Sequence, residues 1–319
     1  MPVHAFIFPG QGSQAVGMGR ELAASFPAAR EVFEEVDETL KLKLSRLMFE
    51  GPPEELTLTE NTQPALMAHS LAVLRVLETE GHVSIKSKAI VAAGHSLGEY
   101  SALCAVGAFS IADAARLLKL RGQAMQKAVP AGEGAMAALL GATMEQAREI
   151  CEAAAPTPEG GKDVVEPAND NGGGQVVISG HRSAIERAVE IAKDKGVRRA
   201  MLLPVSAPFH CALMAPAADA MAEAFEATPP KPPFMPIVAN VSAQKETDPQ
   251  RIAELLVKQV TATVRWRECI DAMVGLGATS FIELGSGKVL SGLAKRIAPD
   301  CTIAAAANPA EIEALLKIL

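Results

Sequence analysis

Hydrophobic residues occur along the chain in short apolar runs, which alternate with longer segments whose apolar positions recur every three or four residues. Residues 3–8 (VHAFIF) and 88–94 (KAIVAAG) are two such runs, and the segments PFMPIVANVSA and ATSFIELG contain two more. Apolar runs bounded by Gly or Pro indicate buried strands, whereas a spacing of three or four indicates helices with one face on a core. The alternation predicts an α/β protein.

The pattern changes to shorter pieces between residues 131 and 203. Their order is strand, helix, strand, strand, helix, strand, with helical patterns in MEQAREICEAAA and SAIERAVEIAKDKG. This is the order of a split βαβ unit with ferredoxin-like topology. We therefore expect a small α+β subdomain over residues 131–203, inserted into a large domain that is formed by residues 1–130 and 204–319.

Ser96 lies at an abrupt turn between the apolar run of residues 88–94 and the helical pattern that follows it. The turn, GHSLG at residues 94–98, has the spacing of a GxSxG nucleophile elbow, whose glycines let the backbone turn sharply and leave Oγ uncrowded. The amide N–H of Leu97 opens the helix and is placed to stabilise an oxyanion. Because the motif is short and also occurs without catalysis, the strand-to-helix context is what makes Ser96 a candidate nucleophile.

A glycine-rich loop, GQGSQ at residues 10–14, follows the first apolar run. Together with Ala15 it matches a GxGxxA dinucleotide fingerprint, with acidic residues about 20 positions downstream. We reject that interpretation because residues 27–40 have a helical pattern, whereas the acid should end a second strand. Two interpretations remain: a plain strand-to-helix connection, or a loop whose amide near Gln11 is a second oxyanion donor.

Arg121 lies on the apolar stripe of the helix predicted in SIADAARLLKLRGQAMQKAV. A buried charge without a partner is costly. Either an internal Asp or Glu pairs with this guanidinium, or the guanidinium holds a substrate carboxylate through two parallel hydrogen bonds, which Lys could not reproduce.

Serine becomes a good nucleophile only when a neighbouring base takes its proton, and one of the six histidines is the expected base. His210 is the best placed, because the loop SAPFH follows a strand pattern where the chain returns to the large domain. His95 should point away from Ser96, and His69 lies within an apolar helix expected to begin near Pro64, which is typical of a core histidine. No Asp or Glu is an evident third triad member, and a backbone carbonyl could orient the imidazole instead.

Composition and charge narrow the possible functions. The 319 residues carry a formal net charge of −7, which argues against a general nucleic-acid or membrane surface, because phosphate binding needs concentrated Lys and Arg. The five cysteines are scattered, with no CxxC spacing for a metal or redox site, so we expect a reducing, cytoplasmic setting. We also expect no signal peptide, and no apolar run reaches the ~18 residues of a membrane helix.

Five segments together resemble the malonyl-CoA:acyl carrier protein transacylases, an acyltransferase family of fatty-acid and polyketide synthesis. They are FPGQGSQ at 8–14, GHSLGEYSAL at 94–103, RGQAMQ at 121–126, FHCALM at 209–214 and LGSGKVLSGLAKRI at 284–297. The resemblance implies a hydrolase-like α/β core with a parallel sheet and a ferredoxin-like insertion. We expect the chain to act as a monomer.

The resemblance also implies a role for each candidate site residue. The implied roles are nucleophile for Ser96, base for His210, orientation of that base for the carbonyl of Gln259, oxyanion-hole amides for Gln11 and Leu97, malonyl-carboxylate clamp for Arg121, and substrate contacts for Gln11, His95 and Phe209. The phenyl ring of Phe209 beside the base resembles that of malonyl-selective relatives.

The implied reaction moves a malonyl group from malonyl-CoA to the phosphopantetheine thiol of acyl carrier protein, with no bound cofactor and no metal. Two other functions use the same residues differently: a thioesterase, in which water attacks the acyl-serine, and a scaffold that only docks the carrier. Carrier proteins are usually acidic, so docking to this acidic chain needs a local basic patch. The candidates are Lys193, Lys195, Arg198, Arg199, Lys288, Lys295 and Arg296.

Overall fold

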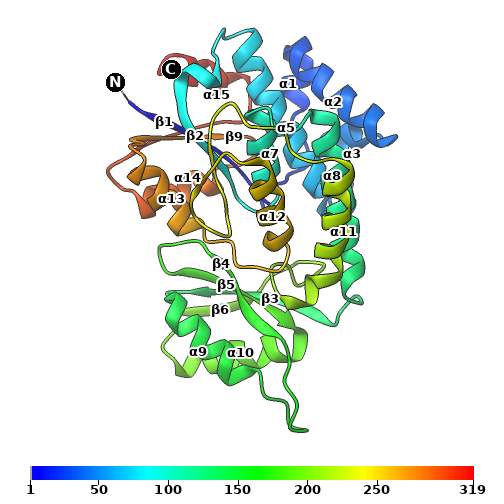
Figure 1. The fold of residues 1–319 in the computed structure, drawn as a ribbon, viewed down its shortest axis with the longest axis vertical. Coiled ribbons are helices and arrows are strands. Elements are labelled where there is room, and N and C mark those ends of the chain that lie inside the picture. The colour runs from blue at the N-terminus through cyan, green and yellow to red at the C-terminus, as the bar shows by residue number, and fades with distance from the viewer. Residues whose placement is uncertain (1) are drawn as a thin grey trace.

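The computed structural model describes residues 2–319 and contains two β-sheets, each with its own helices (Figure 1). The larger sheet lies with both termini in the upper part of the view, and the smaller sheet lies below it. The apolar runs of the sequence form the strands of the larger sheet, as expected. The α/β prediction is therefore confirmed.

The large sheet has the strand order β10-β9-β1-β2-β7-β8. Its strands are β1 (His4–Phe8), β2 (Ala89–Gly94), β7 (Ile237–Val238), β8 (Lys245–Glu246), β9 (Ser280–Leu284) and β10 (Thr302–Ala306). Every pair is parallel except β7 with β8. All residues of β1 are buried, as expected for a central strand covered on both faces. Since Phe8 pairs with Gly94, the carboxyl ends of β1 and β2 lie side by side.

Helices cover both faces of this sheet. They are α1 (Arg20–Ser25), α2 (Pro27–Leu40), α3 (Leu44–Glu50), α4 (Pro53–Thr57), α5 (Thr59–Thr79), α6 (Ile85–Lys88), α7 (Gly98–Ala105), α8 (Ile111–Ala128), η1 (a 3₁₀ turn, Ala212–Met214), α11 (Ala215–Ala227), α12 (Pro249–Gln259), α13 (Trp266–Gly275), α14 (Val289–Ile297) and α15 (Pro309–Leu316). Phe6 and Phe8 pack into the core shared with α2, α5, α7 and α8, whereas Ala5 and Ile7 face α13 and α14. The period of two in β1 thus sets which helices it contacts.

Helix α5 differs from the sequence expectation at its start. The helix begins at Thr59, and Pro64 lies inside it, so the predicted start near Pro64 is wrong. Almost every residue of α5 from Thr62 onward is buried, and this burial outweighs the hydrogen bond that Pro64 cannot donate. His69 is buried as expected of a core residue, with its Nε2 at 2.9 Å from the carbonyl oxygen of Ala307.

The small sheet has the order β4-β5-β3-β6 and is antiparallel. Its elements are β3 (Gly134–Leu140), α9 (Met144–Ala154), β4 (Val165–Asp170), β5 (Gln175–His181), α10 (Arg182–Asp194) and β6 (Arg199–Leu202). Both helices lie below the sheet in Figure 1 and share a separate apolar core with it. This is the predicted ferredoxin-like βαββαβ topology, while the domain limits at residues 130/131 and 203/204 remain a prediction.

The end of β4 is fixed to the large part of the molecule. The amide of Asp170 donates to the carbonyl of Val264, and the amide of Val264 donates to the carbonyl of Ala168, each over 2.9 Å. The guanidinium of Arg267 lies 2.9 Å from the Asp170 carboxylate. These contacts hold the residues after β4 against the carboxyl end of the large sheet.

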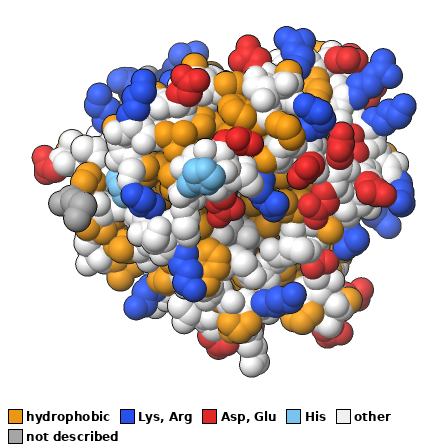
Figure 2. All heavy atoms as spheres, turned by 90° about the horizontal axis from the view of Figure 1, so that it is seen from above, with side chains coloured by type: hydrophobic (Ala, Val, Ile, Leu, Met, Phe, Trp, Pro, Cys, Tyr) orange, Lys and Arg blue, Asp and Glu red, His pale blue; other side chains and the backbone are white. Residues whose placement is uncertain are grey.

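The face that bears the termini carries charged side chains of both signs. Figure 2 shows Lys, Arg, Asp and Glu interspersed there around apolar side chains. Such mixing does not favour a phosphate backbone as a partner on this face. Within residues 2–319, every helix is too short or too polar to cross a lipid bilayer.

Candidate active site

The turn between β2 and α7 places Ser96 at the carboxyl edge of the large sheet. Ser96 has a φ of 53°, in the left-handed region that side chains other than glycine rarely adopt. A Cβ on Gly94 would lie 1.8 Å from the carbonyl oxygen of Gly98, and one on Gly98 would lie 2.3 Å from that of Phe8. The two glycines of GHSLG are therefore required because α7 starts in direct contact with β1 and β2.

Asn240, two residues beyond β7, holds this strained turn from the neighbouring strand. Its Oδ1 accepts the amide N–H of Ser96 at 2.8 Å, and its Nδ2 donates to the carbonyl of Gly94 at 2.8 Å. Strained backbone persists only where surrounding contacts determine it. Asn240, which is fully buried, supplies two of those contacts.

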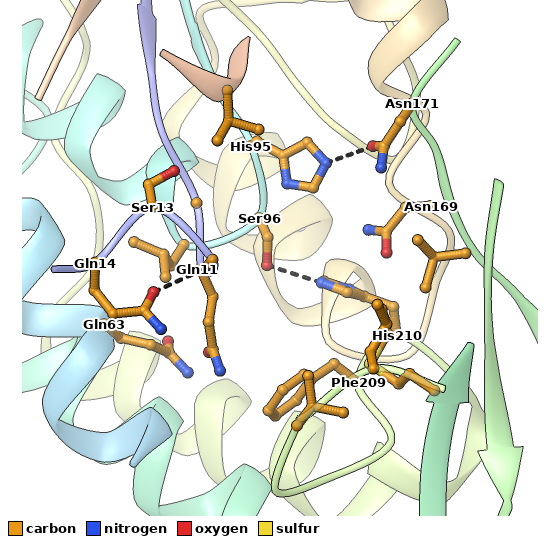
Figure 3. A pocket seen from close by; sticks show the side chains of 18 of the residues that line it. Gln11, Ser13, Gln14, Gln63, His95, Ser96, Asn169, Asn171, Phe209 and His210 are labelled. Carbon is orange, nitrogen blue, oxygen red and sulfur yellow. Dashed lines mark hydrogen bonds between the residues drawn. The ribbon is translucent and has the colours of Figure 1, made fainter. Parts of the chain in front are cut away.

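His210 lies beside the serine, as Figure 3 shows. Its Nε2 is 2.8 Å from Ser96 Oγ, and its Nδ1 is 2.8 Å from the backbone carbonyl oxygen of Gln259. Because a carbonyl oxygen only accepts, Nδ1 carries the proton and Nε2 is free to accept the serine hydroxyl. Burial, together with the charge of Arg121, lowers the pKa of His210 to about 3, so the imidazole is neutral at pH 7.

Arg121 lies on α8 at the floor of the site and is 1% exposed. It donates to Gln63 Oε1 at 2.7 Å, to Gln259 Oε1 at 2.9 Å and to Ser96 Oγ at 3.3 Å. Among residues 2–319 it forms no ion pair with a carboxylate, and its Nε has no hydrogen-bond partner. Of the two interpretations of this cation, the direct internal ion pair is absent: the hydrogen-bond partners of the guanidinium are neutral, and the charge of Glu99 acts on it only from beyond contact distance.

Two amide groups near the serine have no acceptor within the described part of the chain. They belong to Gln11, in the turn after β1, and to Leu97, the N-cap of α7. Both residues line the same cavity as Ser96. Free amide donors beside the nucleophile are one requirement of an oxyanion hole, and the loop at Gln11 is also a strand-to-helix connection.

A cavity of about 630 Å³ opens over these groups. Its walls come from both sheets: Met125 and Phe209 line it from the large part, while Met136 and Val177 line it from β3 and β5. The side chain of Phe209 is 8% exposed and lies next to the base. These side chains make part of the cavity wall apolar, whereas Asn169 and Gln175 add polar groups to it.

His95 lines the cavity but does not reach the serine, in agreement with the sequence expectation. Its Nε2 lies 2.9 Å from Oδ1 of Asn171, just after β4, and its ring packs edge-on against Trp266. Burial lowers the pKa of His95. This contact joins the elbow to the small sheet (Figure 3).

The structure brings to the site several residues that no sequence pattern singled out. Asn240, Glu99, Gln63 and Asn171 all contact a site residue through a side-chain hydrogen bond. Glu99 lies in the GHSLGEYSAL motif and Asn240 follows an apolar run, so each had a weak positional signal. Neither had a signal of chemistry, because the contact between them and the contact of Asn240 with Ser96 each span more than 100 positions of sequence.

The basic residues proposed as a docking patch differ in the contacts that they make. Lys193, Lys195 and Lys288 each form an ion pair with a neighbouring carboxylate. Arg296 instead lies with its guanidinium 3.5 Å from Oε1 of Gln175, which lines the cavity. Arg296 is therefore in contact with a residue of the cavity wall.

Serine acyl-transfer enzymes share an elbow serine with a histidine in hydrogen-bond reach, and this arrangement on an α/β fold defines the class of the protein. The model of the acyl transferase domain family matches residues 5–307. The chain belongs to this acyltransferase family.

Individual relatives agree with that assignment. The chain is 47% identical over 315 residues to the malonyl CoA-acyl carrier protein transacylase of Bacillus subtilis, covering 99% of this chain and 96% of that protein. The crystal structure of acyl-carrier-protein-S-malonyltransferase from Bartonella henselae superposes with a TM-score of 0.94 at 55% identity, covering 99% of both chains. A type II PKS acyl-carrier protein in complex with its malonyl-transacylase gives a TM-score of 0.94 at 41% identity, covering 99% of this chain and 100% of that one.

Proposed function

We propose that the protein transfers a malonyl group from malonyl-CoA to the phosphopantetheine thiol of acyl carrier protein, supplying extender units for fatty-acid synthesis. The observation that carries this proposal is Arg121, a fully buried cation with no carboxylate partner. The charge of Glu99 acts on Arg121 only from a distance, with Gln259 between them, so an anion in direct contact would stabilise this buried cation. A substrate with a terminal carboxylate supplies the missing anion, and the names of the relatives specify malonyl.

The first half of the reaction loads the serine. His210 Nε2 takes the proton of Ser96 as Oγ attacks the thioester carbonyl, and the amides of Gln11 and Leu97 donate to the oxyanion. The carbon–sulfur bond then breaks, CoA leaves with the proton that His210 returns, and malonyl-Ser96 remains. The malonate carboxylate bound at Arg121 also offsets one of the charges that lower the pKa of His210, so the base strengthens when substrate is present.

The second half reverses these steps with another thiol. His210 takes the proton of the phosphopantetheine thiol, the sulfur attacks the malonyl ester, and the serine Oγ leaves with the proton. The carbonyl of Gln259 keeps the imidazole oriented in both halves, since it accepts the Nδ1 proton. The chemistry uses side chains and amides of this chain alone, and we propose no cofactor for it.

We further propose that the reaction takes place in the cytoplasm. All five cysteines are free thiols, four of them buried. Thiols of this kind persist in a reducing compartment.

The proposed function is tested by the substrate preference of Arg121→Ala. The variant should lower kcat/KM for malonyl-CoA by about 10²-fold to 10³-fold, the range for loss of one partner of a buried charged pair. Its activity with acetyl-CoA, which lacks the carboxylate, should fall far less. Both are measured as transfer to carrier protein that bears its phosphopantetheine arm.

The matched control is Arg116→Ala, on the same helix. Arg116 pairs with Asp113 on the surface, with 60% of its side chain exposed, so both substrates should keep their native rates. Equal losses of malonyl and acetyl transfer in Arg121→Ala would show that the guanidinium supports the fold and does not bind the carboxylate.

A further inference from the structure

Glu99 is a buried carboxylate that lies beneath the site and does not enter the reaction. It is 2% exposed, in the first turn of α7. Its Oε2 accepts the side-chain amide of Gln259 at 2.7 Å and the backbone N–H of Asn240 at 3.1 Å. Burial raises the pKa of Glu99 to about 7, against the opposing effect of these hydrogen bonds and of Arg121. A buried carboxylate is costly, so the contacts it makes deserve a functional explanation.

Glu99 fixes which way the carboxamide of Gln259 points. The amide nitrogen of Gln259 faces three acceptors, the Glu99 carboxylate, the carbonyl of Ser96 and Oδ1 of Asn240, and the closest is Glu99. The amide oxygen is thereby turned to accept from Arg121 at 2.9 Å. The reversed orientation would bring the amide N–H₂ against the guanidinium and place an oxygen against a carboxylate, both of which are repulsive.

Asn240 is the second residue that Glu99 holds in place. Its backbone N–H is bound by the carboxylate, and its side chain bridges Gly94 and the strained Ser96. The same carboxylate therefore reaches the nucleophile through Asn240 and the base through Gln259, whose carbonyl accepts from His210.

We propose that Glu99 is a positioning residue, whose carboxylate fixes Gln259 and Asn240 and through them aligns Ser96, His210 and Arg121. The part of this inference that concerns Arg121 rests on the proposed function, whereas the part that concerns Ser96 and His210 does not. Alignment matters because displacement of a reacting group by about 1 Å can cost about 10²-fold in rate.

The test measures the reactivity of Ser96 with a fluorophosphonate probe, at pH 8, in Glu99→Gln and Glu99→Ala. Glu99→Gln keeps the shape and one neutral acceptor, so labelling should slow by about tenfold, the effect of weakening a hydrogen bond to a charged group. Glu99→Ala removes the closest acceptor of Gln259 and the acceptor of the Asn240 backbone N–H, and labelling should slow by about 10²-fold. The melting temperature and the malonyl-to-acetyl preference are recorded on the same samples, and that preference should fall in both variants.

The matched control is Asp37→Asn, a carboxylate-to-amide change in α2 at a residue that does not line the cavity. Asp37 accepts two hydrogen bonds from Ser45, so its loss should lower the melting temperature and leave labelling at the native rate. If Glu99→Gln and Glu99→Ala likewise melt earlier but label within about twofold of the native rate, the residue is only structural and the inference is overturned. If Glu99→Ala does not fold, the labelling rate of the shape-conserving Glu99→Gln decides alone.

These outcomes separate this inference from the proposed function. A native protein that labels at Ser96 but transfers no malonyl contradicts the proposed function and leaves the labelling comparison valid. A native protein that transfers malonyl while the Glu99 variants keep native labelling contradicts only the inference.

Discussion

The two sheets of the molecule contribute to one cavity in different ways. The large sheet and its helices provide the groups in hydrogen-bond contact at the site, Ser96, His210, Gln259 and Arg121. The small sheet provides wall residues such as Met136 and Val177 and one contact to His95. The reacting groups thus lie on the large sheet and its helices, whereas both sheets contribute residues to the cavity wall.

The difference follows from how each sheet is built. Parallel strands bring their carboxyl ends to one edge, where consecutive turns can place side chains together, and sites form there. The antiparallel small sheet has helices on one face, which leaves its other face free to cover a neighbour. The comparison predicts that changes in the large part reduce turnover, whereas changes in the small part alter binding.

The largest effect is expected for His210→Ala. Loss of a general base should lower malonyl transfer by about 10²-fold to 10⁴-fold, mainly in kcat. The matched change in the small part is His181→Ala, at the end of β5, where the ring accepts an amide N–H from Val164 away from the cavity. Steady-state kinetics should show a native rate of malonyl transfer for His181→Ala. An equal loss of rate in His210→Ala and His181→Ala would contradict the different roles of the two sheets.

A smaller effect is expected for Asn171→Ala, which removes the contact between His95 and the residues after β4. The net contribution of one hydrogen bond, about 0.5–1.5 kcal/mol, corresponds to about a twofold to tenfold change in an equilibrium constant. We expect its loss to raise KM for malonyl-CoA by that factor. The kcat should stay near its native value because Ser96 and His210 are untouched. A loss in kcat as great as that of His210→Ala would place the small part in the chemistry.

Arg296→Glu tests the surface beside the cavity. Reversal of a rim charge should raise KM for an acidic carrier protein by about threefold to tenfold, and more at low salt. The rate at which malonyl-CoA loads Ser96 should not change, because this step does not involve the carrier. Reversal of Lys193, which already pairs with Glu190, should have less effect. An unchanged carrier KM would remove Arg296 from the docking surface.

The smallest effect on activity is expected for His69→Gln, in the large part but outside the cavity. Burial lowers the pKa of His69 to about 4 from 6.5, so the unfolded state binds more protons between pH 6.5 and pH 4. Stability therefore falls as pH is lowered through that range, by at most about 3 kcal/mol from this residue. The substitution should flatten the pH dependence of urea unfolding without abolishing it, since His210 contributes in the same direction. An unchanged slope would contradict the prediction.

Much of this site was predictable because its residues carry local signals. Ser96 has glycines that only a tight strand-to-helix turn requires, and Arg121 breaks an apolar stripe. The acceptor for His210 had no such signal, since any residue has a carbonyl, and the assignment to Gln259 came only from the resemblance. The structure brings these groups together as that resemblance implied.

The features that could not be predicted from the sequence share one physical cause, which is tertiary packing. Glu99 and Asn240 act through neighbours that tertiary packing brings to them, and no spacing along the chain reports such contacts. Helix α5 starts at Thr59, before Pro64, because buried packing outweighs the local preference of proline for the first turn of a helix. Strand β10 was missed because its sequence, TIAAA, has little β-propensity of its own and forms by pairing with β9.

The central claim is tested most directly by intact-mass spectrometry of the protein after brief mixing with malonyl-CoA, followed by carrier protein with its phosphopantetheine arm. We expect a malonyl adduct on Ser96 that persists in water and moves to the carrier thiol, and no adduct in Ser96→Ala. Release of free malonate and CoA at the catalytic rate without the carrier would contradict the transferase assignment and indicate a thioesterase.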